Sequence, residues 1–165
     1  AYTSGSSPTT GLISMADIHI DDFYRDVAKI FLRLYAQFPR KTILYVEDIS
    51  GPDEPDEFGL HNPRFHACFS TMVWLADHDY LCFEGTILQE ALDQVVLSQK
   101  AFLILTSRSE LDAEFRVHNP SLPPSVAQEF QSNISQLRGA IKDGSSIMIK
   151  NCVRYLLDHS VVDSF

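Results

Sequence analysis

The segment between residues 62 and 107 constrains the fold of this chain more than any other. Asn62-Pro63 sets a preferred N-cap residue before a proline at the first helical position, which predicts a helix running through FHACFSTMVWLAD. Residues 80–84 and 93–97 have the apolar and β-branched content of two antiparallel strands, and Ser98 is predicted to cap a further helix, QKAFLILTS. The segment is therefore expected to fold as a helix, a hairpin and a second helix.

A helix and a strand are predicted ahead of this segment. Asp21 or Asp22 is expected to cap the helix, and Pro39 to end it. Residues 42–49, TILYVEDI, have the composition of a strand, and Ser50-Gly51-Pro52 closes that strand with turn residues. The helix itself is indicated by apolar residues at helical spacing, namely Phe23, Val27, Ile30, Phe31, Leu34 and Phe38.

Carboxylates crowd between prolines in the next segment, GPDEPDEFGLHNP, which is predicted to be an exposed acidic loop. Three interpretations stay open for this loop: a solvated loop, a contact surface for a basic partner, and a divalent-cation site. For the cation site, the segment lacks the glycine and terminal glutamate spacing of an EF-hand. The candidate partner-binding residues of the loop are Asp53, Glu54, Asp56 and Glu57.

The stretches WLADHDYL, residues 74–81, and VVLSQKA, residues 95–101, carry a resemblance to a known family. They resemble the end of a winged-helix recognition helix, its two wing strands and the helix that follows. The physical reason for such a pattern is that the wing hairpin folds back on the recognition helix, so that strand residues such as Leu81 and Val95 share its core.

The resemblance implies an α+β, mostly α domain over residues 15–107, in the order helix, strand, helix, strand, wing, strand, helix. Winged helices place another helix between the first strand and the recognition helix. Residues 50–62 of this chain instead read as the acidic loop, with room for one short turn near residues 56–59. The departure puts the usual helix-turn-helix pose on DNA in question.

Outside this domain the chain divides into a leader, a connector and a helical region. Residues 1–14, AYTSGSSPTTGLIS, are interpreted as a leader ahead of a natural start at Met15, and residues 108–124 as a polar, proline-containing connector. Residues 125–165 are predicted to form two helices, the first starting at once and ending at Asp143-Gly144-Ser145. These helices would form either a hairpin on the domain or a pairing surface for a second copy. The self-association candidates are Phe130, Ile134, Leu137, Ile141, Tyr155 and Leu156.

The charge balance argues against nucleic acid as the default partner. The chain has 13 Lys and Arg residues against 22 Asp and Glu, a formal net charge of -9 and a sequence pI of about 5.0, which oppose attraction to phosphates. The predicted second helix offers Arg64 as its one dependable cation, and the predicted wing adds Glu90 and no basic residue. A DNA-contacting strip would have to be gathered from Arg25, Lys29, Arg33, Arg40, Lys41, Arg64 and His66.

No segment has the spacing of a known catalytic or metal-binding motif. His61, His66 and Cys68 lie close together, but their spacing does not match a zinc knuckle or ribbon. Glu47 and Asp48 follow one another along the predicted strand, so they would face opposite sides. The three cysteines are interpreted as buried small hydrophobes in a reducing compartment, which favours a cytoplasmic protein, and no apolar run is long enough for a membrane span. No enzymatic activity, cofactor or metal is expected.

Two functions remain. The first is a non-enzymatic winged-helix interaction module that acts by protein–protein contact and self-association, with the acidic loop and the C-terminal helices as contact surfaces. The alternative is a winged-helix DNA-binding transcriptional regulator whose dimer gathers its cations on one face. The two differ in where the cations lie and in how duplex DNA binding responds to salt.

Overall fold

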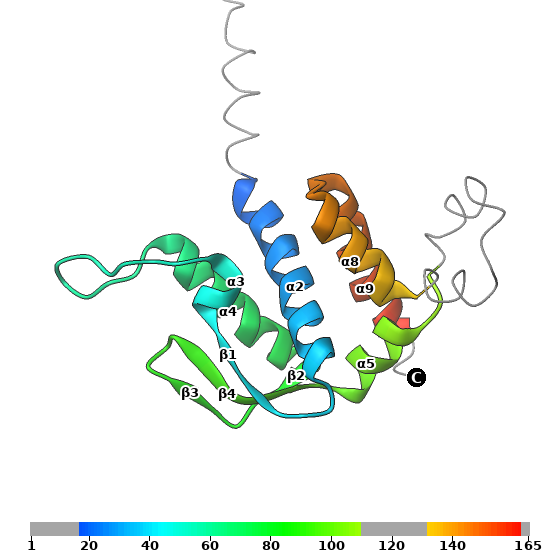
Figure 1. Cartoon of the computed structure of the whole chain (residues 1–165), viewed down its shortest axis with the longest axis horizontal. Coiled ribbons are helices and arrows are strands. Elements are labelled where there is room, and N and C mark those ends of the chain that lie inside the picture. The colour runs from blue at the N-terminus through cyan, green and yellow to red at the C-terminus, as the bar shows by residue number, and fades with distance from the viewer. Residues whose placement is uncertain (1–16, 110–131, 163–165) are drawn as a thin grey trace, which may run out of the picture.

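The computed structural model describes residues 17–109 and 132–162, and it is an α+β fold, mostly helical, with a small antiparallel sheet (Figure 1). The predicted leader, residues 110–124 of the predicted connector, and Phe130 lie outside the described residues. Within the described ranges, no helix is both long enough and apolar enough to cross a membrane. In chain order the elements are α2 (Ile18–Gln37), β1 (Thr42–Tyr45), α3 (Val46–Ser50), α4 (Pro63–Asp77), β2 (Leu81–Cys82), β3 (Gly85–Ile87), β4 (Ala91–Leu97), α5 (Gln99–Thr106), α8 (Asn133–Asp143) and α9 (Ser146–Val162).

Helix α2 runs through the centre of the molecule, with α4 and the sheet on one side and α8 and α9 on the other (Figure 1). It is the predicted first helix, but it starts at Ile18 after Asp17, so Asp21 and Asp22 lie inside its first turns and the predicted cap is wrong. Acidic side chains are favourable there because the N-terminus of a helix carries partial positive charge. Of the predicted apolar positions, the fully buried ones are Val27, Ile30, Phe31 and Leu34, whereas Phe23 and Phe38 are partly buried against the core.

The predicted strand over residues 42–49 is wrong in its second half. Strand β1 ends at Tyr45, which pairs with Ala91, the first residue of β4, so no partner strand remains for the residues that follow. Val46 and Ile49 are both buried, and their separation of three residues places them on one face of the short helix α3. A helix therefore stands ahead of the acidic loop, where none was predicted.

The sheet has the strand order β1-β4-β2, and β3 also pairs with β4. Leu81 of β2 lies opposite Leu97 of β4 in antiparallel register, which confirms the pairing predicted for these two strands. Leu88 and Gln89 both have positive φ and form the tight turn between β3 and β4. The β3–β4 hairpin thus extends away from the helices as a narrow projection (Figure 1).

Two of the three predicted helix caps are confirmed. Asn62 Oδ1 accepts a hydrogen bond from the backbone N–H of Phe65 at 2.9 Å, with Pro63 at the first position of α4. Ser98 Oγ accepts from the backbone N–H of Ala101 at 3.1 Å and so starts α5. Each cap satisfies a helix N–H group that has no partner within the helix.

Helices α8 and α9 form a hairpin that packs against α2 and α5 (Figure 1). Ser132 is extended and caps α8 at Asn133, so the predicted helix does not run unbroken from Ser125. Gly144 ends α8 in the left-handed conformation, with φ 70°, at the predicted break. The predicted pair of C-terminal helices is present, with a shorter first member.

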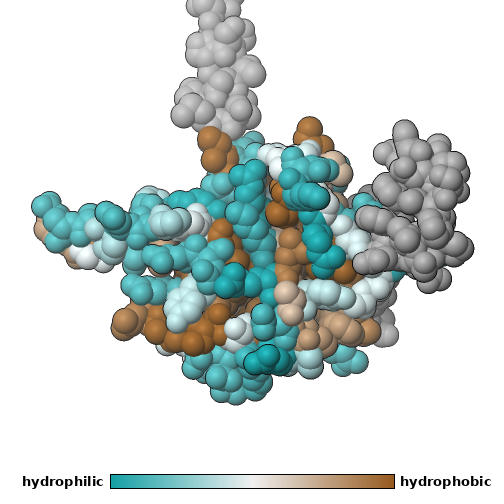
Figure 2. Space-filling view, viewed as in Figure 1, coloured by the Kyte–Doolittle hydropathy of each residue, from teal (hydrophilic) through white to brown (hydrophobic). Residues whose placement is uncertain are grey.

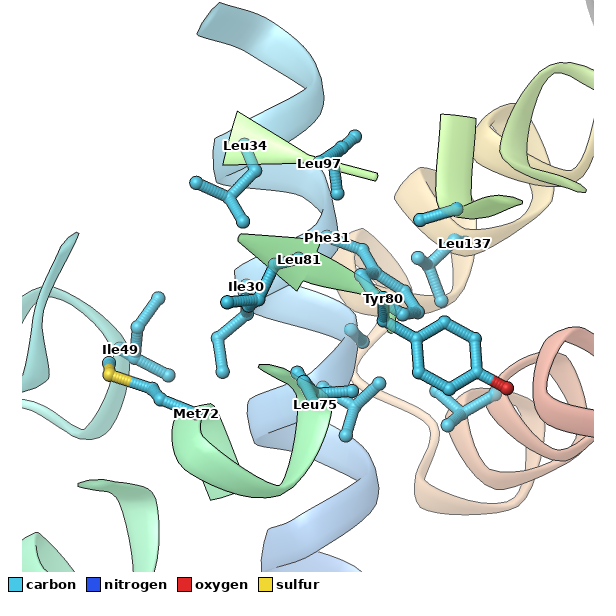
Figure 3. Close-up of a cluster of buried hydrophobic side chains, with 14 of the residues drawn as sticks. Ile30, Phe31, Leu34, Ile49, Met72, Leu75, Tyr80, Leu81, Leu97 and Leu137 are labelled. Carbon is cyan, nitrogen blue, oxygen red and sulfur yellow. The ribbon is translucent and has the colours of Figure 1, made fainter. Parts of the chain in front are cut away.

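The apolar stripe of this hairpin is covered by the chain itself. In Figure 3, Leu137 of α8 lies beside Phe31 of α2 and the ring of Tyr80. Ile134 and Leu156 are buried in the same core cluster. These three predicted self-association residues are therefore not accessible to a second copy, because the hairpin folds back onto α2. Among the candidates, partial exposure is kept by Ile141 and Tyr155.

Candidate partner-binding face

The acidic loop, the first turns of α4 and the β3–β4 turn together form one face of the molecule, which we name the loop face. The loop and the β3–β4 hairpin project on the same side of the helical core (Figure 1). Gly51 ends α3 with φ 96°, and Pro52 and Pro55 cannot continue a helix, so residues 51–62 follow α3 as a loop. No helix lies within those residues.

His61 joins the acidic loop to the β3–β4 turn. Its Nδ1 lies 2.8 Å from Asp53 Oδ2, its Nε2 lies 3.2 Å from Glu90 Oε1, and its ring stacks on Phe65 with the centroids 3.7 Å apart. Because both ring nitrogens face carboxylate oxygens, only the doubly protonated imidazolium donates both hydrogen bonds. The hydrogen bond to Asp53 is the main cause that raises the pKa of His61 above its usual value. We name Asp53, His61 and Glu90 the clasp.

Asp53 differs from the other predicted loop carboxylates because it is turned inward. Its Oδ2 accepts from the backbone N–H of Asn62 at 3.2 Å, and its Oδ1 accepts from the side-chain amide of Asn62 at 2.5 Å. Its side chain is 8% exposed. Asp53 therefore holds the loop to the start of α4 and is not available to a partner. Glu54, Asp56 and Glu57 are exposed, as predicted.

The tip of the loop is held by Asp56. Its Oδ1 accepts hydrogen bonds from the backbone N–H groups of Phe58 and Leu60, each at 2.9 Å, and its own N–H donates to the Leu60 carbonyl at 2.9 Å. Gly59 supplies the positive φ that the turn requires, φ 77°. The turn predicted here presents two apolar side chains to solvent, since Phe58 is 78% and Leu60 is 60% exposed.

Arg64, the cation predicted to face DNA, is turned into the protein. Its guanidinium donates two hydrogen bonds to Asp26 of α2, one of them at 2.7 Å from Nη1, and its Nε lies 3.6 Å from Asp22. The side chain of Asp26 is 1% exposed and that of Arg64 is 29% exposed. A two-pronged ion pair of this kind ties α4 to α2. Arg64 therefore does not project from α4 towards a groove.

The cations of α2 that were predicted to contact DNA, Arg25, Lys29 and Arg33, form a stripe that is also engaged within the chain. Arg33 Nη2 lies 2.9 Å from Asp48 Oδ2 of α3, and Lys29 Nζ donates to the Ile49 carbonyl at 3.4 Å. Arg25 Nη2 donates to a serine hydroxyl at the start of α9 at 3.4 Å. The stripe therefore faces α3 and α9, not the loop face.

The remaining predicted DNA contacts do not converge with Arg64. Lys41 Nζ lies 3.0 Å from Glu84 Oε1, beside β3. Arg40 is exposed and makes no ion pair within the part of the chain that the structure describes. His66 is exposed on α4, with its ring centroid 6.3 Å from that of His61. Among the described residues, the predicted cations thus lie on several elements, and Arg33, Lys41 and Arg64 form ion pairs with carboxylates.

A cleft of about 510 Å³ lies between α2 and α3. Arg33 and Asp48, which form an ion pair, both line it. Because Asp48 is on α3, the argument that Glu47 and Asp48 face opposite sides of a strand is wrong. The cleft is lined by Lys29, Leu32, Arg33, Ala36, Gln37, Thr42, Asp48 and Ile49.

The histidines and cysteines do not assemble a metal centre in the described ranges, where no three His, Cys, Asp or Glu side chains form a metal-binding group. Burial raises the pKa of Cys68 to about 12, which keeps this core side chain a thiol, and Cys152 is also buried. Cys82 is exposed on β2, so the prediction that all three cysteines are buried is wrong. Its side chain points away from the core, as residues alternate along a strand.

Two features of the loop face were missed in the sequence. The signal for Phe58 and Leu60 was present, since two large apolar residues interrupt a run of carboxylates in a predicted exposed loop. The clasp had no signal, because Glu90 is 29 residues away from His61 and reaches it only through the hairpin.

No protein-family model matches this chain, and neither does any curated protein or solved structure. Its function therefore has to follow from the chemistry of the loop face and its surroundings.

Proposed function

We propose that this chain is a winged-helix interaction module that binds a protein through the loop face. The order α2, β1, α3, α4, β2, β3, β4 supports the family assignment, because α3 supplies the helix that winged helices place between the first strand and the recognition helix. The strand order β1-β4-β2 agrees with a hairpin that folds back on α4. In this interpretation α4 is the recognition helix and the β3–β4 hairpin is the wing.

The charge of the loop face is the observation that carries the proposed partner class. Glu54, Glu57 and Glu90 are exposed there, while Arg64 is turned into its ion pair with Asp26. DNA binding draws most of its affinity from several cations that neutralise phosphates, and cations held by carboxylates of the same chain contribute less. A protein surface that carries Lys or Arg side chains complements this face.

A DNA-binding regulator is the second candidate, and α3 is the observation that favours it. Helix α3 precedes α4, with the loop of residues 51–62 between them, and the two helices correspond to the pair on which DNA docking by this family depends. Against it, Arg33 and Lys41 are ion-paired on elements away from the outward face of α4. That outward face has exposed His66, Ser70 and Asp77, none of which is a permanent cation.

Fluorescence anisotropy compares the two candidates directly. We expect a labelled random DNA duplex to show no saturable binding at low salt. A labelled peptide rich in Lys and Arg should bind, and its affinity should fall as salt rises because the contact is between exposed charges. Tight duplex binding that falls steeply with salt would overturn the proposal in favour of the regulator.

A pair of variants locates the contact on the loop face. Glu54→Gln/Glu57→Gln should weaken peptide binding roughly twofold to thirtyfold, since each of the two exposed charge pairs contributes about 0.2–1 kcal/mol. Asp143→Asn/Asp158→Asn removes the same number of exposed carboxylates from the C-terminal hairpin and should leave the affinity unchanged. Equal loss in both variants would mean that only net charge attracts the peptide, which contradicts a role for the loop face.

A further inference from the structure

We infer that the loop tip of one copy docks into the α2–α3 cleft of a second copy. The inference rests on the proposed protein-binding role of the loop face, and it names the partner as this chain itself. In the reciprocal arrangement each tip enters the cleft of the other copy, which closes a two-fold dimer.

The docking element is the pair Phe58 and Leu60. The loop projects from the body as a mainly hydrophilic arm (Figure 2), and these two side chains are its large apolar exceptions. Exposed at 78% and 60%, they neither fill the cleft of their own chain nor contribute to its core. Burial of a side chain of this size in a partner pocket stabilises a complex by about 1.5–3 kcal/mol before the costs of association.

The acceptor is the cleft between α2 and α3, whose lining complements the tip in polarity. Leu32 and Ala36 give it apolar surface, Lys29 and Arg33 also line it, and Ile49 beneath them is only 2% exposed. Its volume of about 510 Å³ falls within the range of roughly 300–1,000 Å³ that receives small-molecule ligands, so two side chains are of suitable size.

The charges of the loop tip and of the α2–α3 cleft are also complementary. Glu54 and Glu57 flank the apolar tip and are exposed. On the cleft side, Lys29 makes one hydrogen bond within residues 17–109 and 132–162, which is long at 3.4 Å and uses one of the three donors of its ammonium group. Arg33 is paired with Asp48 through one nitrogen and carries five N–H donors in all. An acidic tip therefore meets a cleft with two cations and one carboxylate.

Sedimentation velocity over a wide concentration range tests the inference. Wild-type protein is expected to show a reversible monomer–dimer equilibrium. Phe58→Ser/Leu60→Ser should weaken the dimer by roughly tenfold or more, as loss of buried apolar anchors does at other interfaces. Leu88→Ser is the control, because Leu88 is a leucine more exposed than either, 84%, on the neighbouring β3–β4 turn, and its loss should have no effect.

A charge exchange establishes which two surfaces meet. Glu54→Lys/Glu57→Lys sets a basic tip against a basic cleft, and Lys29→Glu/Arg33→Glu sets an acidic tip against an acidic cleft, so each variant alone should be monomeric. Mixing the two variants should restore a heterodimer, because each tip then meets a cleft of opposite charge. Circular dichroism of each variant checks that the fold is intact.

Several results would overturn the inference. Wild-type protein that stays monomeric throughout, a dimer indifferent to Phe58 and Leu60, or a mixture that fails to re-form would each do so. None of these results decides the proposed function, which is tested separately by the binding of the cationic peptide and of duplex DNA. Binding of the peptide to a strictly monomeric protein would mean that the loop face serves a different protein.

Discussion

The C-terminal hairpin and the acidic loop were both predicted to contact partners, and the structure treats their apolar residues in opposite ways. The hairpin buries Ile134, Leu137 and Leu156 against α2, whereas the loop leaves Phe58 and Leu60 in solvent. Apolar periodicity therefore shows that a helix face needs to be covered and does not say by what. Two apolar residues in a run of carboxylates, a weaker pattern, mark a surface that the chain leaves exposed, as it also leaves Ile147 at the start of α9.

The contrast between the hairpin and the loop would be contradicted most directly if a core residue of the hairpin could be replaced without loss of stability. Leu137→Ala is expected to lower the free energy of unfolding by about 3–5 kcal/mol, because Leu137 is fully buried and its loss leaves a cavity. Phe58→Ala, which removes a larger side chain from the loop tip, should change it by no more than about 0.5 kcal/mol. Urea denaturation measures both, and equal losses would mean that the two regions are not different in kind.

The ion pair between Asp26 and Arg64 tests the same contrast at the base of the acidic loop. It fixes α4, the helix at which the loop ends, to α2. Asp26→Ala is expected to cost about 3 kcal/mol, at the lower end for a buried pair since Arg64 is partly exposed. The double variant Asp26→Ala/Arg64→Met should lose less than the sum of the two single variants, since it leaves no unpaired charge. Strict additivity in urea denaturation would show that the two side chains do not act as a unit.

The smallest effect is expected from the clasp, and it depends on pH. Folding raises the pKa of His61, so the clasp stabilises the folded protein fully below the unfolded value of 6.5 and loses that contribution as pH rises through the folded pKa. His61→Gln keeps a polar side chain without the charge. The difference in unfolding midpoint between wild type and this variant should therefore shrink as pH rises above 6.5. A difference that stays constant with pH would mean that His61 acts only by stacking on Phe65.

The hydrogen exchange of the loop provides a local check on the same residue. Backbone amides of Phe58 and Leu60 are held by Asp56 and not by the clasp, so their protection should persist in His61→Gln. The amide of Asn62, which donates to Asp53, should exchange faster. Loss of protection at both sites would show that the loop opens as one unit.

Much of the fold followed from the sequence because its signals are local. Asn62 and Ser98 cap α4 and α5 as predicted, since a cap acts within three residues of its helix. Helix α3 could not be predicted from the sequence, because its Val and Ile favour strands. They have no strand partner only because β4 begins at Ala91, opposite Tyr45. What cannot be read locally is which distant group reaches a given side chain.

The predicted site residues show the same difference between local signals and long-range contacts. Glu54 and Glu57 are exposed as the loop composition predicts, whereas Asp53 is drawn inward by His61 and Asn62. Arg64 was predicted to face outward on α4, but Asp26, 38 residues earlier, holds it against α2. Long-range ion pairs of this kind decide which charges remain on a surface, and a single sequence does not identify them.

The anchoring of the acidic loop has a consequence for how this domain can change. Gly51 at the end of α3 and Asn62 at the start of α4 fix the two ends of the loop within the folded body. The chain between them is a loop whose two ends are fixed. Doubling its length would raise the entropic cost of closing the loop by only about 0.6 kcal/mol. If the loop tip is what a partner recognises, insertions and substitutions there alter specificity while folding is nearly unaffected. The domain is then a stable platform that carries an exchangeable recognition element.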